Sequence, residues 1–165
     1  MLKYLMFLFI TVISFSIFIS CDDTSTGPEV GTHILKIAHF GVDWSEGKAA
    51  TETDVVENSD GETIGWCPNG HGGGWGQGVW YRSSVDNIYR FGTGSLNDVK
   101  SVDTTKWSRD VCLTPLANGD IWVAEALDGY VAFKVIDAPM DSTEVADNPF
   151  WRVEVEYKFS TTLGF

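Results

Sequence analysis

The ten residues FWRVEVEYKF, numbers 150–159, limit the fold of this chain more than any other segment. Apolar or aromatic side chains alternate there with charged ones. The first set is Trp151, Val153, Val155, Tyr157 and Phe159, and the second is Arg152, Glu154, Glu156 and Lys158. A period of two places one set on a buried face and the other in water. The pattern predicts a strand over 150–159, with Trp151 in the core and one solvated face.

Several other segments also have the pattern of strands. Residues 119–126, GDIWVAEA, and 129–136, GYVAFKVI, flank Asp128-Gly129. This dipeptide predicts a hairpin with a type I′ turn, in which both central residues have positive φ. Shorter strands are expected at 33–40, 63–67, 78–83 and 87–91. No segment has a convincing helical period with caps, although the connection 92–107 has room for one helical turn. The predicted class is all-β, an antiparallel sandwich or a partly open barrel.

The N-terminal segment MLKYLMFLFITVISFSIFISC has the layout of a secretory signal. Lys3 is followed by an uncharged run up to Ser20 and then by Cys21. The end of the run resembles the lipobox of bacterial lipoproteins, in which a small residue precedes a cysteine that is diacylated and becomes the new N-terminus. Phe18 departs from the usual aliphatic residue of that motif. The alternatives are an uncut membrane anchor and an ordinary secretory cut.

The signal, the polar segment after it and the strand pattern divide the chain into three expected parts: a cleaved signal helix at 1–20, a flexible polar tether at 21–31, and a single all-β domain at 32–165. The domain is long enough to bury a substantial core. If Cys21 carries lipid, Cys67 and Cys112 remain as an even pair. Because exported proteins meet an oxidising compartment, we expect a disulfide between them. Two unrelated buried thiols are the alternative.

The charge of the chain limits its partners. The formal net charge is −12, and removal of Lys3 with the signal leaves the expected mature protein at −13. Such a surface repels phosphate backbones, which argues against nucleic-acid binding. It also repels anionic headgroups, so the acyl chains must provide the contact with the membrane. Asp22 follows the lipobox cysteine, but its effect on sorting differs between bacterial groups. The expected location is therefore the inner or outer membrane, facing the periplasm or the cell surface.

The segment GWCPNGHGGGWGQGVWY, residues 65–81, has six glycines within 70–78. No lysine follows them and a strand is predicted next, so a phosphate-binding loop is excluded. His71 is a candidate metal or haem ligand, with a partner such as Met140, and a plain loop is the alternative. Trp75 could stack on a flat ligand or fold back over the core. Trp80 and Tyr81 are further ligand candidates.

The remaining tryptophans have mainly structural interpretations. Trp66 and Trp80 lie beside predicted strands, which favours the core over a ligand platform. Trp122 alternates with its neighbours Ile121 and Val123 in the predicted hairpin, and this placement is compatible with the core or its rim.

No catalytic signature of the GxSxG, HExxH or CxxC kind occurs in the chain. Acidic residues crowd the segment 137–149, but their spacing matches no EF-hand, and a solvated loop is the better interpretation. These acidic residues are Asp137, Asp141, Glu144 and Asp147. An acidic pair for polysaccharide hydrolysis is not singled out by any pattern. The sequence thus favours a protein that is not an enzyme.

The segments IWVAEALDGYVAFKVI and WRVEVEYKF, within 119–159, resemble the C-terminal strands of HmuY-type haem-binding lipoproteins of the Bacteroidota. That resemblance implies an all-β lipoprotein with haem held by loop side chains. No paired histidines form such a motif here, and His71 and Met140 are the loop residues that could serve. The leading expectation is a lipid-anchored binding domain without a cofactor, for a small molecule, glycan or protein. A haemophore-like protein, a polysaccharide-acting enzyme and a purely structural envelope lipoprotein are the alternatives.

Overall fold

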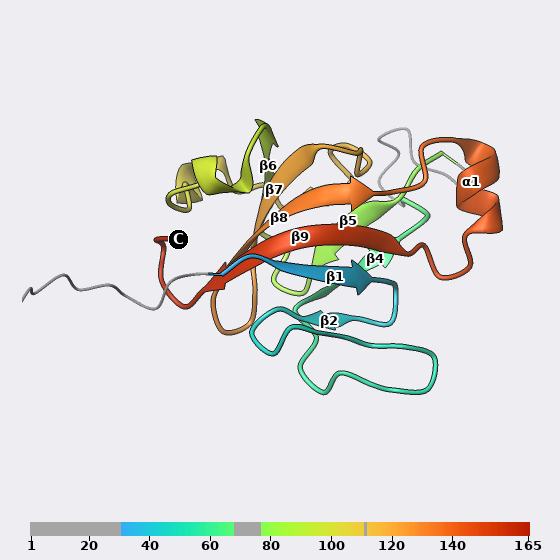
Figure 1. The fold of residues 1–165 in the computed structure, drawn as a ribbon, viewed down its shortest axis with the longest axis horizontal. Helices are drawn as coiled ribbons and strands as arrows, with labels where there is room; N and C mark the ends of the chain where they lie inside the picture. The colour runs from blue at the N-terminus through green and yellow to red at the C-terminus, as the bar shows by residue number, and fades with distance from the viewer. Residues whose placement is uncertain (1–30, 68–76, 111) are drawn as a thin grey trace, which may run out of the picture.

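The computed structural model describes residues 31–67, 77–110 and 112–165 (Figure 1). The predicted signal peptide, Cys21 and most of the tether lie outside this range, as do His71 and Trp75. The described chain forms two antiparallel sheets, which do not close into a barrel. The all-β prediction is therefore confirmed, in its sandwich form.

The strands of the described residues follow one another in chain order with three short helices between them. They are β1 His33–Ile37, β2 Val42–Asp43, β3 Lys48–Ala49, β4 Gly61–Ile64, β5 Trp80–Ser83, β6 Ile88–Thr93, β7 Asp120–Glu125, β8 Tyr130–Asp137 and β9 Val153–Ser160. The helices are the 3₁₀ turns η1 Leu96–Asp98 and η2 Thr104–Lys106, and α1 Ser142–Asp147. The two-residue strands β2 and β3 are too short to leave a periodic signal in the sequence, which is why they were not predicted.

The larger sheet has the order β1-β9-β8-β7-β6, and the smaller has the order β3-β2-β4-β5. Strand β9 lies between β1 and β8, with Val155 opposite both Leu35 and Val135. In the smaller sheet β4 pairs with β5, where Glu62 is opposite Arg82. Consecutive strands are mostly neighbours, as expected for short antiparallel connections.

The main core fills the space between the two sheets. Trp44 and Tyr81 project from the side of the smaller sheet, and Phe133 from the larger. The ring of Phe133 stacks on Trp44 at 5.6 Å between centroids and meets the edge of Tyr81 at 5.1 Å. Such aromatic pairs add to the free energy gained by burying their apolar area. This core holds the two sheets face to face.

A second core covers the opposite face of the larger sheet. Ile121 and Val123 of β7 are buried there under Leu96 of η1 and Val99. The C-terminal residue Phe165 also packs on this cluster. The connection 92–107, for which the sequence predicted at most one helical turn, contains both η1 and η2. This connection covers the outer face of the larger sheet.

The second core buries part of the β9 face that was expected to be in water. Val153, Val155 and Tyr157 are buried, as the alternation predicts. The prediction of a fully solvated opposite face is wrong at Lys158, which is 4% exposed. Its ammonium group donates a hydrogen bond to the Val99 carbonyl and lies 5.0 Å from the Phe165 ring centroid. Burial lowers the pKa of Lys158, and the charge of Lys100 lowers it further.

The strand predicted over 150–159 begins later, at Val153. Phe150 and Trp151 have φ of 73° and 49°, a left-handed conformation that costs roughly 1–2 kcal/mol for each such residue. The turn is held by the His39 N–H, which donates to the Phe150 carbonyl, and by the Thr63 hydroxyl, which donates to the Trp151 carbonyl at 2.7 Å. Trp151 packs against the main core, partly buried, from this turn.

The hairpin between β7 and β8 is present, but its predicted turn type is wrong. Glu125 pairs with Tyr130, so residues 126–129 form a longer connection. Neither Asp128 nor Gly129 has a positive φ. The Ala126 N–H donates to the Gly129 carbonyl at 2.9 Å, so the turn is centred on Leu127 and Asp128, one residue earlier than the predicted pair. The Leu127 N–H donates to the carboxylate of Asp60 at 2.8 Å.

Helix α1 lies in the acidic segment for which a loop was predicted. Asp141 is its N-cap, and its carboxylate accepts hydrogen bonds from the N–H groups of Thr143 and Glu144. Glu144 accepts from the Met140 N–H at 2.5 Å. These contacts satisfy backbone donors that the helix itself cannot pair. The DSTE spacing of residues 141–144 was a readable capping signal that the missing helical period concealed.

Candidate functional site

The predicted ligand residues fall into three groups. His71 and Trp75 lie outside the described residues, so their proposed roles stay predictions, and the same holds for lipid attachment at Cys21. Trp80 and Tyr81 are 1% and 2% exposed, so neither side chain lies on a surface that a ligand could reach in this conformation. Met140 is 59% exposed, beside α1.

Tyr81 belongs to a buried polar network at the base of the main core. The Trp44 indole N–H donates to the Tyr81 hydroxyl at 2.8 Å, and that hydroxyl donates to the Asp60 carbonyl at 3.3 Å. The Asp60 carboxylate accepts from the N–H groups of Trp44 and Leu127, each at 2.8 Å. Burial raises the pKa of Asp60, while these two hydrogen bonds oppose the shift. The network links the chain segments at Trp44, Asp60 and Leu127 to Tyr81 of β5, and its role is structural.

Trp80 faces the other side of the smaller sheet, where it packs with the disulfide. The predicted bond between Cys67 and Cys112 is present, with their Cα atoms 5.8 Å apart. Both cysteines are buried with Trp80, and Ile64 packs against them. The disulfide therefore fixes the chain around residue 112 onto the outer face of β4 and β5.

Trp66 is not in the core, contrary to the sequence prediction. It is 57% exposed although it precedes the buried Cys67. Strand β4 ends at Ile64, two residues before Trp66. The backbone of Gly65 lies against the Trp151 indole, where any added Cβ would be 2.2 Å from Nε1. Gly65 is thus buried, and the next residue, Trp66, lies on the surface.

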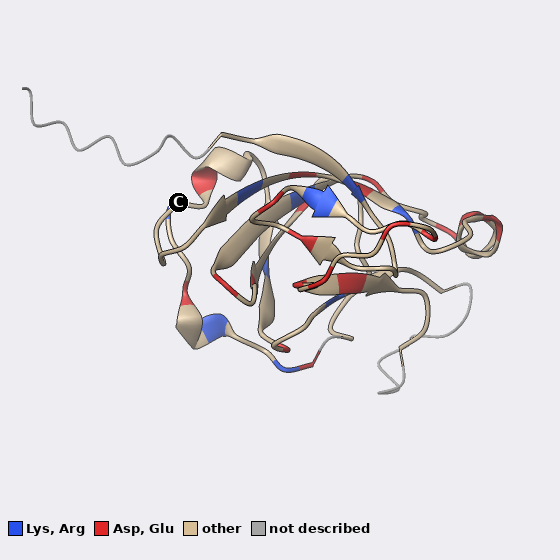
Figure 2. Ribbon diagram, turned by 90° about the horizontal axis from the view of Figure 1, so that it is seen from below, with Lys and Arg blue, Asp and Glu red and all other residues tan. Residues whose placement is uncertain are grey.

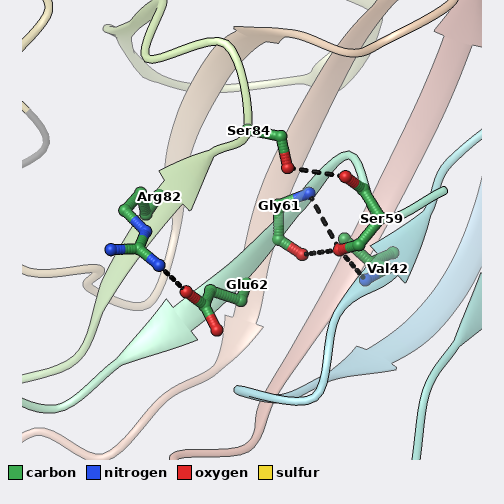
Figure 3. Close-up of polar contacts among 6 residues, drawn as sticks. All are labelled: Val42, Ser59, Gly61, Glu62, Arg82 and Ser84. Atoms are coloured by element: carbon green, nitrogen blue, oxygen red, sulfur yellow. Dashed lines mark hydrogen bonds and ion pairs between the residues drawn. The ribbon is translucent and has the colours of Figure 1, made fainter. Parts of the chain in front are cut away.

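Cys112 and its disulfide cover only one half of the outer face of β4 and β5. The other half is open and forms a cleft of about 420 Å³. We call it the β4–β5 cleft. Its lining residues come from the segment before β4, from both strands and from the turn after β5. They are Ser59, Gly61, Glu62, Arg82, Ser83, Ser84 and Asp86. Figure 3 shows Glu62 and Arg82 on one side of this region, with Ser59 and Ser84 on the other.

Internal hydrogen bonds hold the serine side of the cleft. The Ser59 hydroxyl donates to the Gly61 carbonyl at 2.8 Å and accepts from the N–H groups of Val42 and Gly61 (Figure 3). The Ser84 hydroxyl donates to the Ser59 carbonyl at 2.6 Å. Gly61 lies tightly against β5, since a Cβ there would be 2.2 Å from the Tyr81 hydroxyl and 2.5 Å from the Arg82 carbonyl.

The opposite side carries an ion pair across the two strands. Arg82 Nη2 donates to Glu62 Oε1. The Arg82 side chain is about half exposed and Glu62 about a quarter exposed. A guanidinium has five N–H donors in a planar fork, and the hydrogen bonds found among the described residues use only Nη2 of Arg82. Both charged groups can therefore form further hydrogen bonds into the cleft.

Two smaller clefts also lie on the surface of the described residues. One, of about 280 Å³, lies beside α1 and includes Met140, Glu144 and Arg152. The carboxylate of its Glu144 accepts from the Met140 N–H, and Arg152 pairs with Glu52 at 3.4 Å. The other, of about 240 Å³, is bounded by residues 43–48 and 55–58. Among the residues described, no group of three or more His, Cys, Asp or Glu side chains is placed to hold a metal ion.

The residues of the β4–β5 cleft carried no signal in the sequence. Glu62 and Arg82 are twenty positions apart, and each is an ordinary polar residue on the exposed side of a short strand. Ser59 and Ser84 lie in turns, where serine is common. Only the pairing of β4 with β5 brings them together.

The chain has no match among protein-family models, curated proteins or solved structures. The resemblances to lipobox signals and to HmuY-type proteins therefore stay predictions. Within the described residues, no helix has the length and apolar character needed to cross a bilayer.

Proposed function

We propose that this protein is an exported, lipid-anchored binding domain of the bacterial envelope. The observation that carries the proposal is the disulfide between Cys67 and Cys112. Disulfides persist in oxidising compartments outside the cytoplasm. The pairing also leaves Cys21 as the third cysteine of the chain, at the position where the lipobox resemblance places the acyl chains.

The arrangement of the domain is compatible with a tether at one end. In Figure 1 the described chain begins at the same end of the molecule as the C-terminus, and α1 lies at the opposite end. Gly31 lies ten positions after Cys21, and an extended segment of that length reaches at most about 35 Å. Acyl chains on Cys21 would therefore hold the domain close to the membrane, with the α1 end directed away from it.

A binding role, rather than a catalytic one, is the function we favour for the domain. Its two cores form a firm framework, and the open half of the smaller sheet presents polar groups to solvent at the β4–β5 cleft. Binding sites commonly combine such a rigid framework with a few placed polar groups.

Anchoring is tested by mass spectrometry of the N-terminal peptide from the full-length chain expressed in a bacterial host. We expect this peptide to begin at Cys21 and to carry the mass of its acyl groups. Cys21→Ser should abolish the modification and release the protein from the membrane fraction. The double variant Cys67→Ala/Cys112→Ala is the matched control and should stay acylated. An N-terminal peptide that begins at Met1 with an unmodified Cys21 would overturn the proposal.

A further inference from the structure

The outer face of the β4–β5 pair is divided into a covered half and an open half. At Ile64 and Trp80 the chain around Cys112 covers it, held by the disulfide. At Glu62 and Arg82 nothing among the described residues covers the face, and the β4–β5 cleft opens there. The covered pair, Ile64 and Trp80, and the uncovered pair, Glu62 and Arg82, are only two residues apart along each strand.

The polar groups of this cleft include both hydrogen-bond donors and hydrogen-bond acceptors. Arg82 supplies N–H donors, and the second carboxylate oxygen of Glu62 supplies an acceptor. Asp86, with a positive φ of 58°, adds an exposed carboxylate at the rim. The Ser84 hydroxyl uses its hydrogen on Ser59 and keeps its lone pairs. A ligand here needs groups that donate and accept at closely spaced positions, and hydroxyl groups do both.

Charge narrows the class of ligand further. The lining contains two carboxylates and one guanidinium, so the formal charge of the cleft is negative by one. The whole chain is at −12, and Figure 2 shows Asp and Glu over the strands, the loops and α1. An anionic ligand would meet repulsion from this field. A neutral ligand has no such penalty, and the Glu62–Arg82 pair can bind its hydroxyl groups with charge-assisted hydrogen bonds.

The groups are also held in place before any ligand arrives. Arg82 and Glu62 fix each other across the strand pair, and Ser59 makes three hydrogen bonds to the surrounding backbone. Restricted side chains lose less conformational entropy on binding. The volume of about 420 Å³ lies within the range of small-molecule sites, about 300–1,000 Å³.

We propose that the β4–β5 cleft binds a neutral saccharide, with Arg82 and Glu62 as the residues that contact its hydroxyl groups. The proposal rests on the binding role stated above and names the ligand class for it. It does not depend on lipidation, because none of the groups involved belongs to the tether.

The test is saturation-transfer-difference NMR and calorimetry on the full-length chain in detergent. The probes are maltotriose, cellotriose and chitotriose, with trigalacturonic acid as the anionic comparison. We expect binding of at least one neutral trisaccharide and none of the anionic one. Arg82→Met and Glu62→Gln should each weaken the affinity by about tenfold or more, since each removes a charge-assisted hydrogen bond.

Arg152→Met and Glu52→Gln are the matched controls, because they break an exposed Arg–Glu pair elsewhere on the domain. They should leave the affinity unchanged. The absence of binding to all three neutral probes, or binding that Arg82→Met and the controls affect equally, would overturn the saccharide proposal. Cys21→Ser should bind as the unaltered chain does, so a failure of the anchoring proposal would be seen separately from a failure here.

Discussion

Lys158 and Asp60 show how two ionisable side chains are accommodated inside this domain. Both are almost fully buried. Asp60 receives two backbone N–H groups, whereas the hydrogen bond of Lys158 goes to a single carbonyl, that of Val99. A buried charge is tolerated only when such partners replace its hydration. The two residues therefore tie β9 and the connections around β4 to distant parts of the chain.

Lys158 should make stability depend on pH on the alkaline side. Its pKa is lowered from 10.5 in the folded state, so the folded protein binds fewer protons than the unfolded chain between the two pKa values. The free energy of unfolding should therefore rise with pH across that window. Lys158→Met should remove this rise. Urea unfolding from about pH 8 to about pH 10.5 measures it, and an equal slope in both proteins would contradict the prediction.

The element that most depends on a covalent bond is the connection between β6 and β7. It runs over the larger sheet through η1 and η2 and then reaches the smaller sheet at Cys112. Hydrogen bonds from Ser108 to Ile88 and from the Leu116 N–H to the Val79 carbonyl secure it on either side of the disulfide. One connection thus contacts both sheets.

Removal of the disulfide should destabilise the domain substantially. The bond closes a loop with a sequence separation of 45, for which chain entropy alone gives about 4 kcal/mol. We expect Cys67→Ala/Cys112→Ala to lower the free energy of urea unfolding by about that amount. The reduced unaltered protein is the control and should behave in the same way. A loss below about 1 kcal/mol would show that the surrounding contacts suffice without the bond.

At the scale of the whole molecule, the excess of acidic residues opposes compaction. The chain has 23 Asp and Glu against 11 Lys and Arg. The ion pairs that do form are mostly exposed, such as Lys48–Asp54 and Arg152–Glu52, and exposed pairs contribute little to stability. Uncompensated like charges therefore repel one another across the folded surface.

Salt should stabilise this domain. The Debye length falls from about 30 Å at 0.01 M to about 8 Å at 0.15 M ionic strength, which screens repulsion between exposed charges. We expect a gain of about 1 kcal/mol, equivalent to about 4 °C in the melting temperature for a domain of this size. Calorimetry in NaCl and in MgCl₂ at equal ionic strength should give the same gain. A melting temperature that falls as salt is added would refute the prediction.

The candidate site was beyond prediction from the sequence, for a physical reason. Glu62, Arg82, Ser59 and Ser84 are individually ordinary, and their convergence depends on the pairing register of two short strands. The sequence directed attention instead to the glycine-rich segment, with Trp80 and Tyr81 as further ligand candidates, although its strand pattern favoured the core for Trp80. Both proved to be buried, on opposite faces of the same strand.

The fold class and most strands follow from the sequence alone, because alternation along a strand is local and reports burial directly. Val153, Val155 and Tyr157 are buried as their spacing requires. The cysteine count likewise indicated the disulfide. Three features were set by long-range packing instead: the burial of Lys158, the start of the strand after the strained turn at Phe150 and Trp151, and the exposure of Trp66. These features depend on which distant segment covers each face, and local periodicity carries no information about that.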